Sequence, residues 1–280
     1  MTIPQLQQSI EGEHPPAAGA SIQSIDIDGA TIGYRLDGPS GAPTLVLANS
    51  LGTNFTMWDA QMPAFAARFR VLRYDSRGHG VSTAGTVPYT IERLARDVLM
   101  LLDRLRIART HFCGLSLGGV IGIWLGAHAS SRIDRLVLCN TSPRIGSTEL
   151  WNARIDAVRR GGLEAVADAV LDRFLTRDFR QHAPETARRL RDALTAGSPD
   201  GYRASCAAIR DIDHWDSIAA IDRPTLVVSS THDTATPAAD GWRMAHKIAG
   251  ARYVELDAGH ISNVEAAEAF TGEVLRFLEA

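Results

Sequence analysis

The chain has 280 residues, of which 45% are hydrophobic and 22% are charged, and its formal net charge is −3. A chain of this size can bury a large core, and its length suits one large α/β domain or two smaller ones. Acidic and basic residues are mixed along the sequence, which excludes a basic stripe for nucleic acid and a polybasic patch for a membrane surface. We therefore expect a small molecule as the partner.

The amino-terminal residues 1–20 predict a flexible tail. They contain Gln, Glu and Pro where a secretory signal peptide needs a positive start and an apolar stretch. No apolar run in the chain approaches membrane-spanning length. We therefore expect a cytoplasmic protein with no membrane partner.

Residues 21–38 predict an antiparallel hairpin, because SIQSIDIDG and ATIGYRLDG alternate apolar and polar residues around Asp-Gly signals. Six further short apolar runs predict buried strands, mostly separated by helical patterns: residues 44–49, 70–75, 110–115, 135–141, 225–230 and 252–257. This alternation is typical of a parallel sheet with helices on both faces. The sequence thus predicts an α/β fold with a mostly parallel, eight-stranded sheet.

The alternation of strands and helices stops in the middle of the chain. Residues 151–175 and 184–197 have the apolar spacing of amphipathic helices and contain no strand signal. We expect residues 142–217 to form an inserted helical cap. The core domain would then consist of residues 21–141 and 218–280.

The three cysteines, Cys113, Cys139 and Cys206, are isolated in apolar surroundings and lack the spacing of metal ligands. We expect them to be buried, reduced thiols. The sequence predicts neither a disulfide framework nor a zinc site.

Ser116 lies in the stretch GLSLG, residues 114–118, where a predicted strand changes to a helical pattern. This spacing fits the nucleophile elbow, a sharp strand-to-helix turn that exposes a serine hydroxyl. The flanking glycines let the chain pass where a Cβ would clash. The alternative is a tight glycine turn with an incidental serine.

A serine nucleophile needs a base within hydrogen-bond reach, and that base needs a carboxylate to orient it. His260 and Asp233 follow the last two predicted strands. Since the carboxyl ends of parallel strands share one edge of a sheet, we expect both beside Ser116. The order Ser116, Asp233, His260 is also the chain order of triads built on this elbow. Asp257 is the reserve candidate for the acid.

Two other histidines compete for a functional role. His79 lies in DSRGHG, where the glycines and Arg77 favour a structured turn over catalysis. His232 precedes Asp233 and suggests metal binding, but no third ligand lies nearby in the sequence. No metal site is predicted.

An acyl-transfer site also needs N–H donors for the developing oxyanion. The amide of Leu117 follows the nucleophile at the start of a helix and is one candidate. The amide of Leu51, next to Gly52 in the loop after the strand at 44–49, is the other. An ordinary glycine turn is the alternative for that loop. Because a hydroxyl, an imidazole, a carboxylate and two amides complete such a site, we expect no metal and no organic cofactor.

The sequence resembles the α/β-hydrolase superfamily and, more narrowly, the 3-oxoadipate enol-lactonases of aromatic catabolism. The resemblance covers nearly everything after residue 22 and rests on NSLGTNFTMWDAQ, RYDSRGHGVS, FCGLSLGGV, LCNTSPRIG, CAAIRDID and ARYVELDAGHISNVEAAEAF. NSLGT followed by MW, and HISN after the last strand, are more specific than the serine motif. The resemblance implies an α/β-hydrolase fold with the triad Ser116, Asp233 and His260 and the oxyanion donors Leu51 and Leu117.

The activity implied by the resemblance is hydrolysis of 3-oxoadipate enol-lactone to 3-oxoadipate, in the β-ketoadipate pathway. Ser116 would attack the lactone carbonyl while His260 takes its proton. The free carboxylate of that substrate needs a cation or amide in the cap, and three residues are candidates by position: Arg144, Arg154 and Arg173.

Three apolar residues are candidates for the pocket wall, with core packing as the alternative for each: Trp151, Met57 and Trp58. The sequence departs from the family pattern at RFLT, residues 173–176, where a tryptophan commonly follows the arginine. This departure affects the cap and leaves the triad intact.

Other functions stay open because the triad serves any activated acyl group. The first alternative is a general carboxylesterase or another lactonase. A carbon–carbon bond hydrolase and a ligand receptor of the same fold are the others. Homo-oligomerisation is also left open by the sequence.

Overall fold

A two-stranded hairpin opens the sheet, as the sequence predicts. The computed structural model describes residues 21–280, so the predicted tail, residues 1–20, lies outside the described residues. β1 (Gln23–Ile27) and β2 (Ala30–Asp37) pair antiparallel. The Asp28-Gly29 turn between them has positive φ angles of 45° and 75°, which glycine and aspartate tolerate better than most residues.

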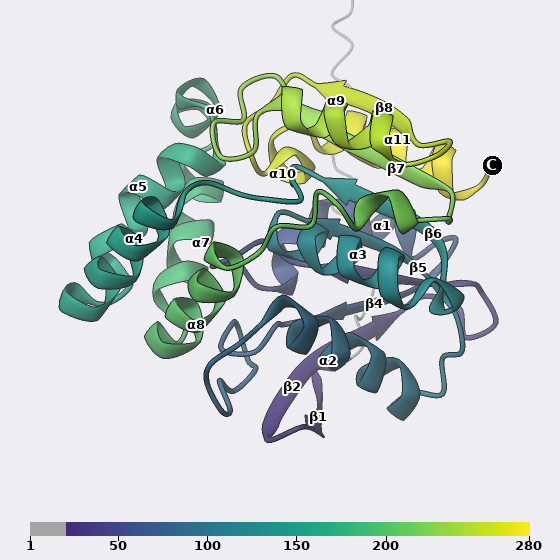
Figure 1. Ribbon diagram of the computed structural model, residues 1–280, viewed down its shortest axis with the longest axis horizontal. Coiled ribbons are helices and arrows are strands. Elements are labelled where there is room, and N and C mark those ends of the chain that lie inside the picture. The colour runs from purple at the N-terminus through teal and green to yellow at the C-terminus, as the bar shows by residue number, and fades with distance from the viewer. Residues whose placement is uncertain (1–20) are drawn as a thin grey trace, which may run out of the picture.

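Six parallel strands follow this hairpin in one continuous sheet (Figure 1). They are β3 (Thr44–Ala48), β4 (Arg70–Tyr74), β5 (Thr110–Leu115), β6 (Ile133–Cys139), β7 (Thr225–Ser230) and β8 (Arg252–Leu256). The strand order is β1-β2-β4-β3-β5-β6-β7-β8, and only the pairs β1–β2 and β2–β4 are antiparallel. The prediction of a mostly parallel, eight-stranded sheet is confirmed.

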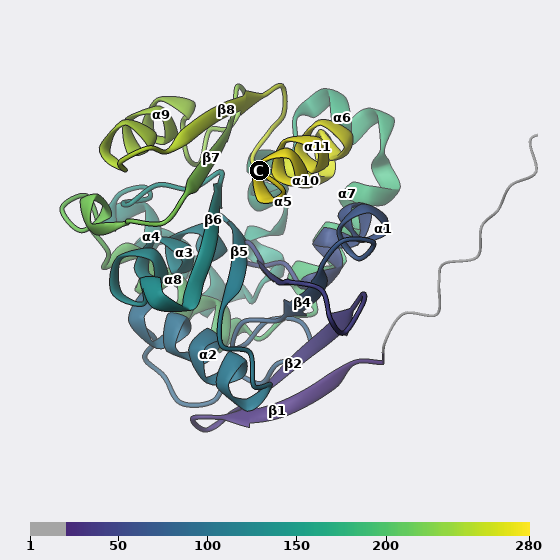
Figure 2. The same ribbon diagram turned by 90° about the vertical axis from the view of Figure 1, so that its right-hand side faces the viewer.

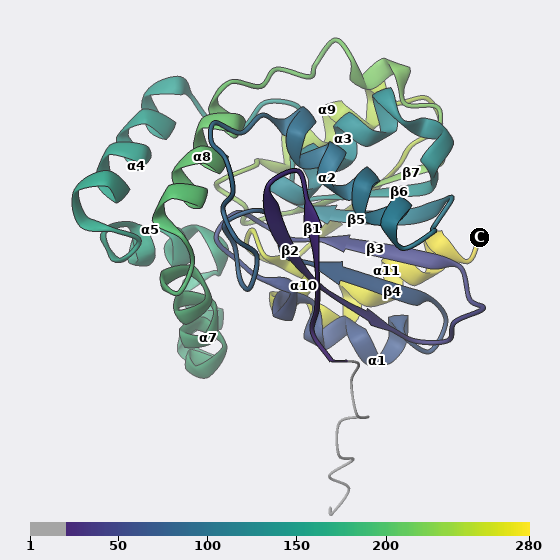
Figure 3. The ribbon, with the colours of Figure 1, turned by 90° about the horizontal axis from the view of Figure 1, so that it is seen from below.

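Helices cover both faces of the sheet (Figures 2 and 3). One face carries α2 (Ile91–Arg104), α3 (Leu117–His128) and α9 (Ala238–Lys247). The other carries the 3-10 helix η1 (Phe55–Gln61) with α1 (Met62–Phe65), α10 (Ser262–Glu265) and α11 (Ala267–Leu278). None of the helices within residues 21–280 is both long and apolar enough to cross a bilayer.

Five helices between β6 and β7 stand together on one side of the sheet (Figure 1). They are α4 (Thr148–Gly161), α5 (Glu164–Phe174), α6 (Arg177–His182), α7 (Pro184–Thr195) and α8 (Pro199–Arg210). Ser147, Thr176 and Ser198 cap α4, α6 and α8, each accepting a backbone N–H with its hydroxyl oxygen. All five lie inside the predicted cap, whose limits at 142 and 217 remain our proposal.

The cap rests on the core at a point where two glycines meet. A Cβ on Gly201 of α8 would lie 2.5 Å from the Cα of Gly78, and one on Gly78 would lie 2.4 Å from the Cα of Gly201. The Ser198 N–H donates to the Gly78 carbonyl oxygen at 3.2 Å nearby. Only residues without side chains allow the cap to approach the core this closely.

The three cysteines are buried and unpaired, as predicted. The sulfurs of Cys113 and Cys139 lie 3.8 Å apart on neighbouring strands β5 and β6. Burial raises the pKa of the Cys139 thiol, so it stays protonated and behaves as a small apolar side chain.

Two glycines make the turn from β5 into α3 possible, Gly118 where the turn packs on β3 and Gly114 where the turn packs on itself. A Cβ on Gly118 would lie 2.2 Å from the carbonyl oxygen of Ala48, and a Cβ on Gly114 would lie 2.1 Å from the carbonyl oxygen of Gly118. Both distances are too short for any side chain. The glycines of GLSLG are therefore a packing requirement of this turn.

Replacing Gly118 by alanine should destabilise the protein, because the obstacle is backbone of a central strand. We expect Gly118→Ala to lower the free energy of unfolding by at least about 2 kcal/mol, the scale of an overpacked core. Gly41→Ala is the control, since a Cβ there meets nothing within 4 Å. Chemical denaturation of the two variants measures the difference, and equal stabilities would contradict the packing argument.

Candidate active site

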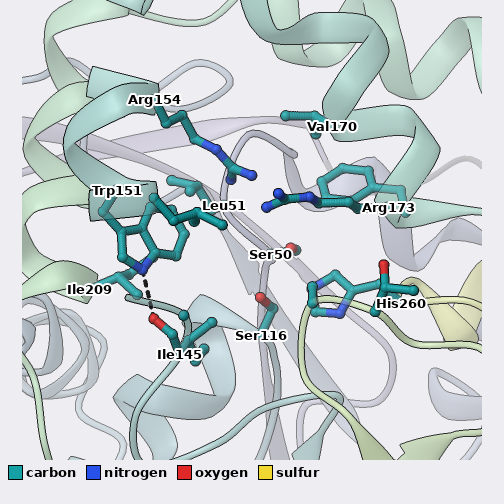
Figure 4. A pocket seen from close by; sticks show the side chains of 15 residues that line it. Ser50, Leu51, Ser116, Ile145, Trp151, Arg154, Val170, Arg173, Ile209 and His260 are labelled. Atoms are coloured by element: carbon teal, nitrogen blue, oxygen red, sulfur yellow. Dashed lines mark hydrogen bonds between the residues drawn. The ribbon is translucent and has the colours of Figure 1, made fainter. Parts of the chain in front are cut away.

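Ser116 occupies the turn between β5 and α3 in a conformation that non-glycine residues rarely adopt. Its φ is 56° and its ψ is −111°. The Ser116 N–H donates to the Cys139 carbonyl oxygen at 2.9 Å, and the Ser116 carbonyl oxygen accepts from Thr141 Oγ1 at 2.9 Å. Such backbone strain persists only where the surroundings hold it, and here β6 holds it from one side. In Figure 4 the Ser116 hydroxyl lies beside the ring of His260.

His260 and Asp233 lie together as the sequence predicts. His260 Nδ1 is 2.8 Å from Asp233 Oδ2, and both side chains are buried. The ring of Phe174 stacks on the His260 ring with centroids 6.0 Å apart. The imidazole is thus held by a carboxylate at one nitrogen and by an aromatic face from the cap.

The carboxylate of Asp233 accepts hydrogen bonds from several neighbouring groups. Its Oδ1 accepts the N–H groups of Ala235 at 2.8 Å and Thr236 at 2.9 Å, and its Oδ2 accepts Thr236 Oγ1 at 2.6 Å and Asn140 Nδ2 at 3.0 Å. Burial alone would raise its pKa, but the charge of His260 and the hydrogen bonds from His260 and Thr236 lower the pKa to about 2. Asp233 is therefore ionised at neutral pH.

Asn140, at the end of β6, orients this carboxylate and was not singled out from the sequence. Its φ is 44°, and its N–H donates to the Val228 carbonyl oxygen at 2.7 Å. Its amide nitrogen reaches Ser230 Oγ at 2.8 Å, and its amide oxygen accepts from Ser262 Oγ at 2.6 Å. Asn140 thus joins the strand ends to the loop that carries the histidine. The sequence signal that could have identified Asn140 is its place in the motif LCNTSPRIG.

The reserve acid, Asp257, lies elsewhere. Its Oδ1 is 2.9 Å from Nε2 of His232, and both side chains are largely exposed to solvent. Asp233, not Asp257, carries the contact to His260. Within residues 21–280 no group of three or more His, Cys, Asp or Glu side chains is arranged to hold a metal ion.

His79 belongs to a structured turn, as the sequence indicates. It is buried, its Nδ1 lies 3.0 Å from the Arg77 carbonyl oxygen, and burial lowers its pKa. Arg77 is buried as well and donates to both oxygens of Asp97, from Nε at 2.5 Å and from Nη2 at 2.6 Å. This ion pair fixes the turn, and neither residue lines the pocket around Ser116.

The backbone N–H groups of Leu51 and Leu117 are the predicted oxyanion donors. Within residues 21–280, neither N–H donates to another protein group. Leu117 is the first residue of α3, and Leu51 lines the same pocket as Ser116 and His260. The Gly118 N–H donates to the Asn49 carbonyl oxygen at 3.0 Å, which ties the two loops together. Their role as an oxyanion hole remains our proposal.

Asn49 fixes the loop that carries Leu51. Its amide nitrogen donates to the Tyr74 carbonyl oxygen at 2.9 Å and to Asp75 Oδ1 at 3.1 Å, and its amide oxygen accepts from Trp58 Nε1 at 2.9 Å. Burial raises the pKa of Asp75 to about 6, although the N–H groups of Val81 and Phe55 counteract the rise. The loop is therefore pinned to the end of β4.

A pocket of about 680 Å³, including its open mouth, lies between the cap and the residues Ser116 and His260 (Figure 4). Its polar and charged lining consists of Ser50, Ser116, Arg154, Arg173, Thr234 and His260. Apolar side chains line the rest: Leu51, Ile145, Leu150, Trp151, Val170, Phe174, Ala235 and Ile209. Phe174 follows Arg173 in RFLT, where a tryptophan is common in the family, and it supplies an aromatic ring to this pocket.

Trp151, Arg154 and Arg173 all line this pocket, and their contact with substrate stays a prediction. Trp151 Nε1 donates to the Ile145 carbonyl oxygen at 2.6 Å, and the Arg154 guanidinium lies 4.8 Å from the centre of the Trp151 ring. Neither arginine forms an ion pair with a carboxylate in the described part of the chain. Burial and the charge of Arg154 lower the pKa of Arg173. The positive charges of the two guanidinium groups therefore repel each other in this cavity.

Three predicted contacts lie outside this pocket. Arg144 is exposed and faces Asp213 of the cap base, with Nη1 at 3.6 Å from Oδ2. The sulfur of Met57 accepts a hydrogen bond from Thr53 Oγ1 at 3.0 Å, and Trp58 is fully buried. Both belong to η1, which turns these side chains under the loop and into the core. The predictions for Arg144, Met57 and Trp58 are wrong.

Glu265 joins the cap to the histidine loop. Its Oε2 accepts the N–H groups of Gly259 at 3.0 Å and Thr176 at 3.1 Å, and its Oε1 accepts from the Thr176 hydroxyl. The Ile261 N–H also donates to the Phe174 carbonyl oxygen at 2.9 Å. Ile261 is thus bonded to the last residue of α5, and Gly259 is connected through Glu265 to Thr176, the residue that precedes α6.

Comparisons with known proteins agree with this arrangement. Residues 43–267 match the model of the alpha/beta hydrolase fold family. The chain is 37% identical to 3-oxoadipate enol-lactonase 2 of Acinetobacter baylyi, over 87% of this chain and 91% of that protein. It is 34% identical to RutD of Rhizobium rhizogenes, provisionally assigned as a carbamate hydrolase, over 88% of this chain and 96% of that protein.

A solved structure is also similar. The enol-lactonase from Burkholderia xenovorans LB400 superposes with a TM-score of 0.91 at 48% identity, covering 92% of this chain and all of that one. The chain therefore belongs to the alpha/beta hydrolase family. It is a hydrolase, and enol-lactonases are among its relatives.

The low pKa of Asp233 predicts a specific loss of stability in acid. Because the pKa of Asp233 is about 2 in the folded protein, below its ordinary value of 3.8, its ionised form stabilises the fold above about pH 4. This contribution, about 2 kcal/mol, is lost as the pH falls from 4 toward 2. The unfolding free energies of wild type and Asp233→Asn should therefore converge by about this amount between pH 5 and pH 2. A difference that does not change with pH would contradict it.

Proposed function

We propose that the protein is a serine hydrolase in which Ser116 is the nucleophile, His260 the base and Asp233 the orienting acid. The contact of 2.8 Å between His260 Nδ1 and Asp233 Oδ2 supports this assignment, because it leaves Nε2 to face the serine. The buried, ionised Asp233 stabilises the imidazolium that forms when the proton moves. The amides of Leu51 and Leu117 receive the negative charge that develops on the carbonyl oxygen.

The substrate we propose is 3-oxoadipate enol-lactone. Ser116 Oγ attacks the lactone carbonyl as His260 takes the hydroxyl proton, and collapse of the tetrahedral intermediate breaks the ring C–O bond. The leaving enolate stays tethered to the acyl-enzyme and becomes a ketone on gaining the proton that His260 took from Ser116, which returns His260 to its neutral form. Water, deprotonated by His260, then attacks the ester, and Ser116 recovers its proton as 3-oxoadipate departs.

The observation that carries this substrate is the pair of arginines opposite the triad. Arg154 and Arg173 lie in the wall of the pocket that contains Ser116 and His260, without a carboxylate partner in residues 21–280. Two unpaired guanidinium groups in an otherwise largely apolar cavity suit a small ligand with a free carboxylate. The names of the relatives agree with such a ligand.

A general carboxylesterase or another lactonase is the alternative, because the triad serves any activated acyl group and the cap sets the selectivity. The match to RutD adds amide-like substrates to that alternative. A role in the β-ketoadipate pathway, a cytoplasmic location and independence of cofactors follow from the proposal and stay predictions, and homo-oligomerisation remains open.

Removal of the nucleophile should abolish turnover without unfolding the protein. Ser116→Ala deletes one oxygen from a turn at the pocket, so it creates no core cavity. We expect kcat to fall by at least about a thousandfold, and His260→Ala to cost nearly as much. Steady-state kinetics together with chemical denaturation test this expectation. Retention of more than about a thousandth of the wild-type kcat by Ser116→Ala would overturn the assignment.

Selectivity tests the proposed substrate. We expect kcat/KM for the enol-lactone to exceed that for p-nitrophenyl acetate by at least about a hundredfold, or about 3 kcal/mol of transition-state binding. Equal or reversed preference would leave a serine hydrolase and remove the lactonase.

The arginines should account for the anionic part of that preference. Arg154→Gln or Arg173→Gln should lower kcat/KM on the enol-lactone by roughly 10- to 100-fold, the value of a charge-assisted contact. Activity on the neutral ester should change by less than about threefold. Arg144→Gln is the matched control, because Arg144 lies outside the pocket. If Arg144→Gln had the same effect, the carboxylate site would not be where we place it.

A further inference from the structure

The Ser50 hydroxyl is a buried donor that the proposed mechanism leaves unused. Ser50 is 2% exposed, and its Oγ has no hydrogen-bond partner in the described part of the chain. It lines the pocket with Ser116 and His260, and in Figure 4 its hydroxyl faces the space in front of them. A buried hydroxyl without a partner is unfavourable unless a ligand supplies one.

Other buried hydroxyls do not share this location. Within residues 21–280, the hydroxyls of Tyr74 and Ser76 lie within reach of each other, that of Tyr202 lies within reach of Arg154, and that of Ser205 has no partner. None of these side chains lines the pocket that contains Ser116. Among these residues, only Ser50 has a hydroxyl that an acyl group bound in this pocket can reach.

The backbone of Ser50 is fixed on both sides, so its side chain is presented from a rigid position. The Ser50 N–H donates to the sulfur of Met57 at 3.4 Å. The Ser50 carbonyl oxygen accepts the Thr53 N–H at 3.2 Å and Thr53 Oγ1 at 2.8 Å. The next residue is Leu51, whose amide is the proposed oxyanion donor. Side chain and amide therefore approach a bound carbonyl from adjacent residues of one turn.

We propose that the Ser50 Oγ–H donates a third hydrogen bond to the oxyanion that forms when Ser116 attacks an acyl carbon. This inference rests on the proposed serine-hydrolase function. The bond strengthens as the carbonyl oxygen gains negative charge, so it lowers the barrier more than it tightens substrate binding. The hydroxyl rotates about its C–O bond, so it can reach the oxyanion without movement of the loop. Arg154 and Arg173 remain free for a distant carboxylate.

The test compares Ser50→Ala with Ser205→Ala, which deletes a buried hydroxyl that also lacks a partner but lies outside the pocket. We expect Ser50→Ala to lower kcat by roughly 10- to 100-fold with KM changed by less than about twofold. Ser205→Ala should keep wild-type kinetics. Thermal denaturation of both variants shows whether each is folded at the assay temperature.

A tetrahedral inhibitor gives a second measurement that does not depend on turnover. Propylboronic acid forms an adduct on a serine nucleophile that places an oxygen in the oxyanion hole. Its inhibition constant should rise in Ser50→Ala by a factor similar to the fall in kcat, and should not change in Ser205→Ala. Loss of kcat without loss of boronate affinity would overturn the proposal.

Two further results would overturn it. An unchanged kcat in Ser50→Ala would show that the hydroxyl makes no bond in the transition state. A raised KM at constant kcat would place the hydroxyl on the bound substrate instead of the oxyanion. Both p-nitrophenyl acetate and the enol-lactone are used, because the Ser50 effect is expected on any ester that Ser116 attacks. Failure of the lactonase proposal alone would therefore leave the Ser50 effect measurable on the ester.

Discussion

The backbone of Ser116 is the constraint on which the site depends. Its φ of 56° and ψ of −111° turn the chain so sharply that α3 starts against β3, with the Gly118 N–H on the Asn49 carbonyl oxygen at 3.0 Å. That bond fixes the distance between the nucleophile turn and the loop that carries Ser50 and Leu51. Strain in one residue thus places the proposed nucleophile, Ser116, and the proposed oxyanion donors in a single rigid unit.

Asparagine side chains extend this unit across the sheet. Asn140 joins β6 and β7 to the histidine loop, and Asn49 joins β3 and β4. Asn263, three residues after His260, donates to the Met57 carbonyl oxygen at 2.7 Å and to Gln61 Oε1 at 3.2 Å. The HISN and NSLGT motifs, some two hundred residues apart in sequence, are therefore parts of one hydrogen-bond network. Amides suit this task because each both donates and accepts.

The strands, the nucleophile turn and the contact between Asp233 and His260 were predictable, because periodicity and the polarity of a parallel sheet determine them. The sequence could not separate Arg144 from Arg154 and Arg173, since the choice depends on how each cap segment is rotated when it packs. Met57 and Trp58 come soon after the loop that carries Leu51, so the sequence made them candidates for the pocket wall. The 3-10 helix η1 instead directs both side chains into the core. Asn140 and Glu265 were missed because their partners come from distant parts of the chain.

The cap and the proposed base, His260, are joined by direct contacts, which limits how the site can change. Phe174 stacks on His260, its carbonyl oxygen accepts the Ile261 N–H, and Glu265 connects the following residues of the cap to Gly259. The helix that contributes Arg173 to the pocket is therefore the helix whose end holds the histidine loop. A substitution that moves α5 to admit a larger acyl group also moves the imidazole. On the proposed mechanism, substrate selectivity and proton transfer are consequently coupled through this end of the cap. Selectivity would be easier to alter from α4, which carries Trp151 and Arg154 and contributes none of these bonds.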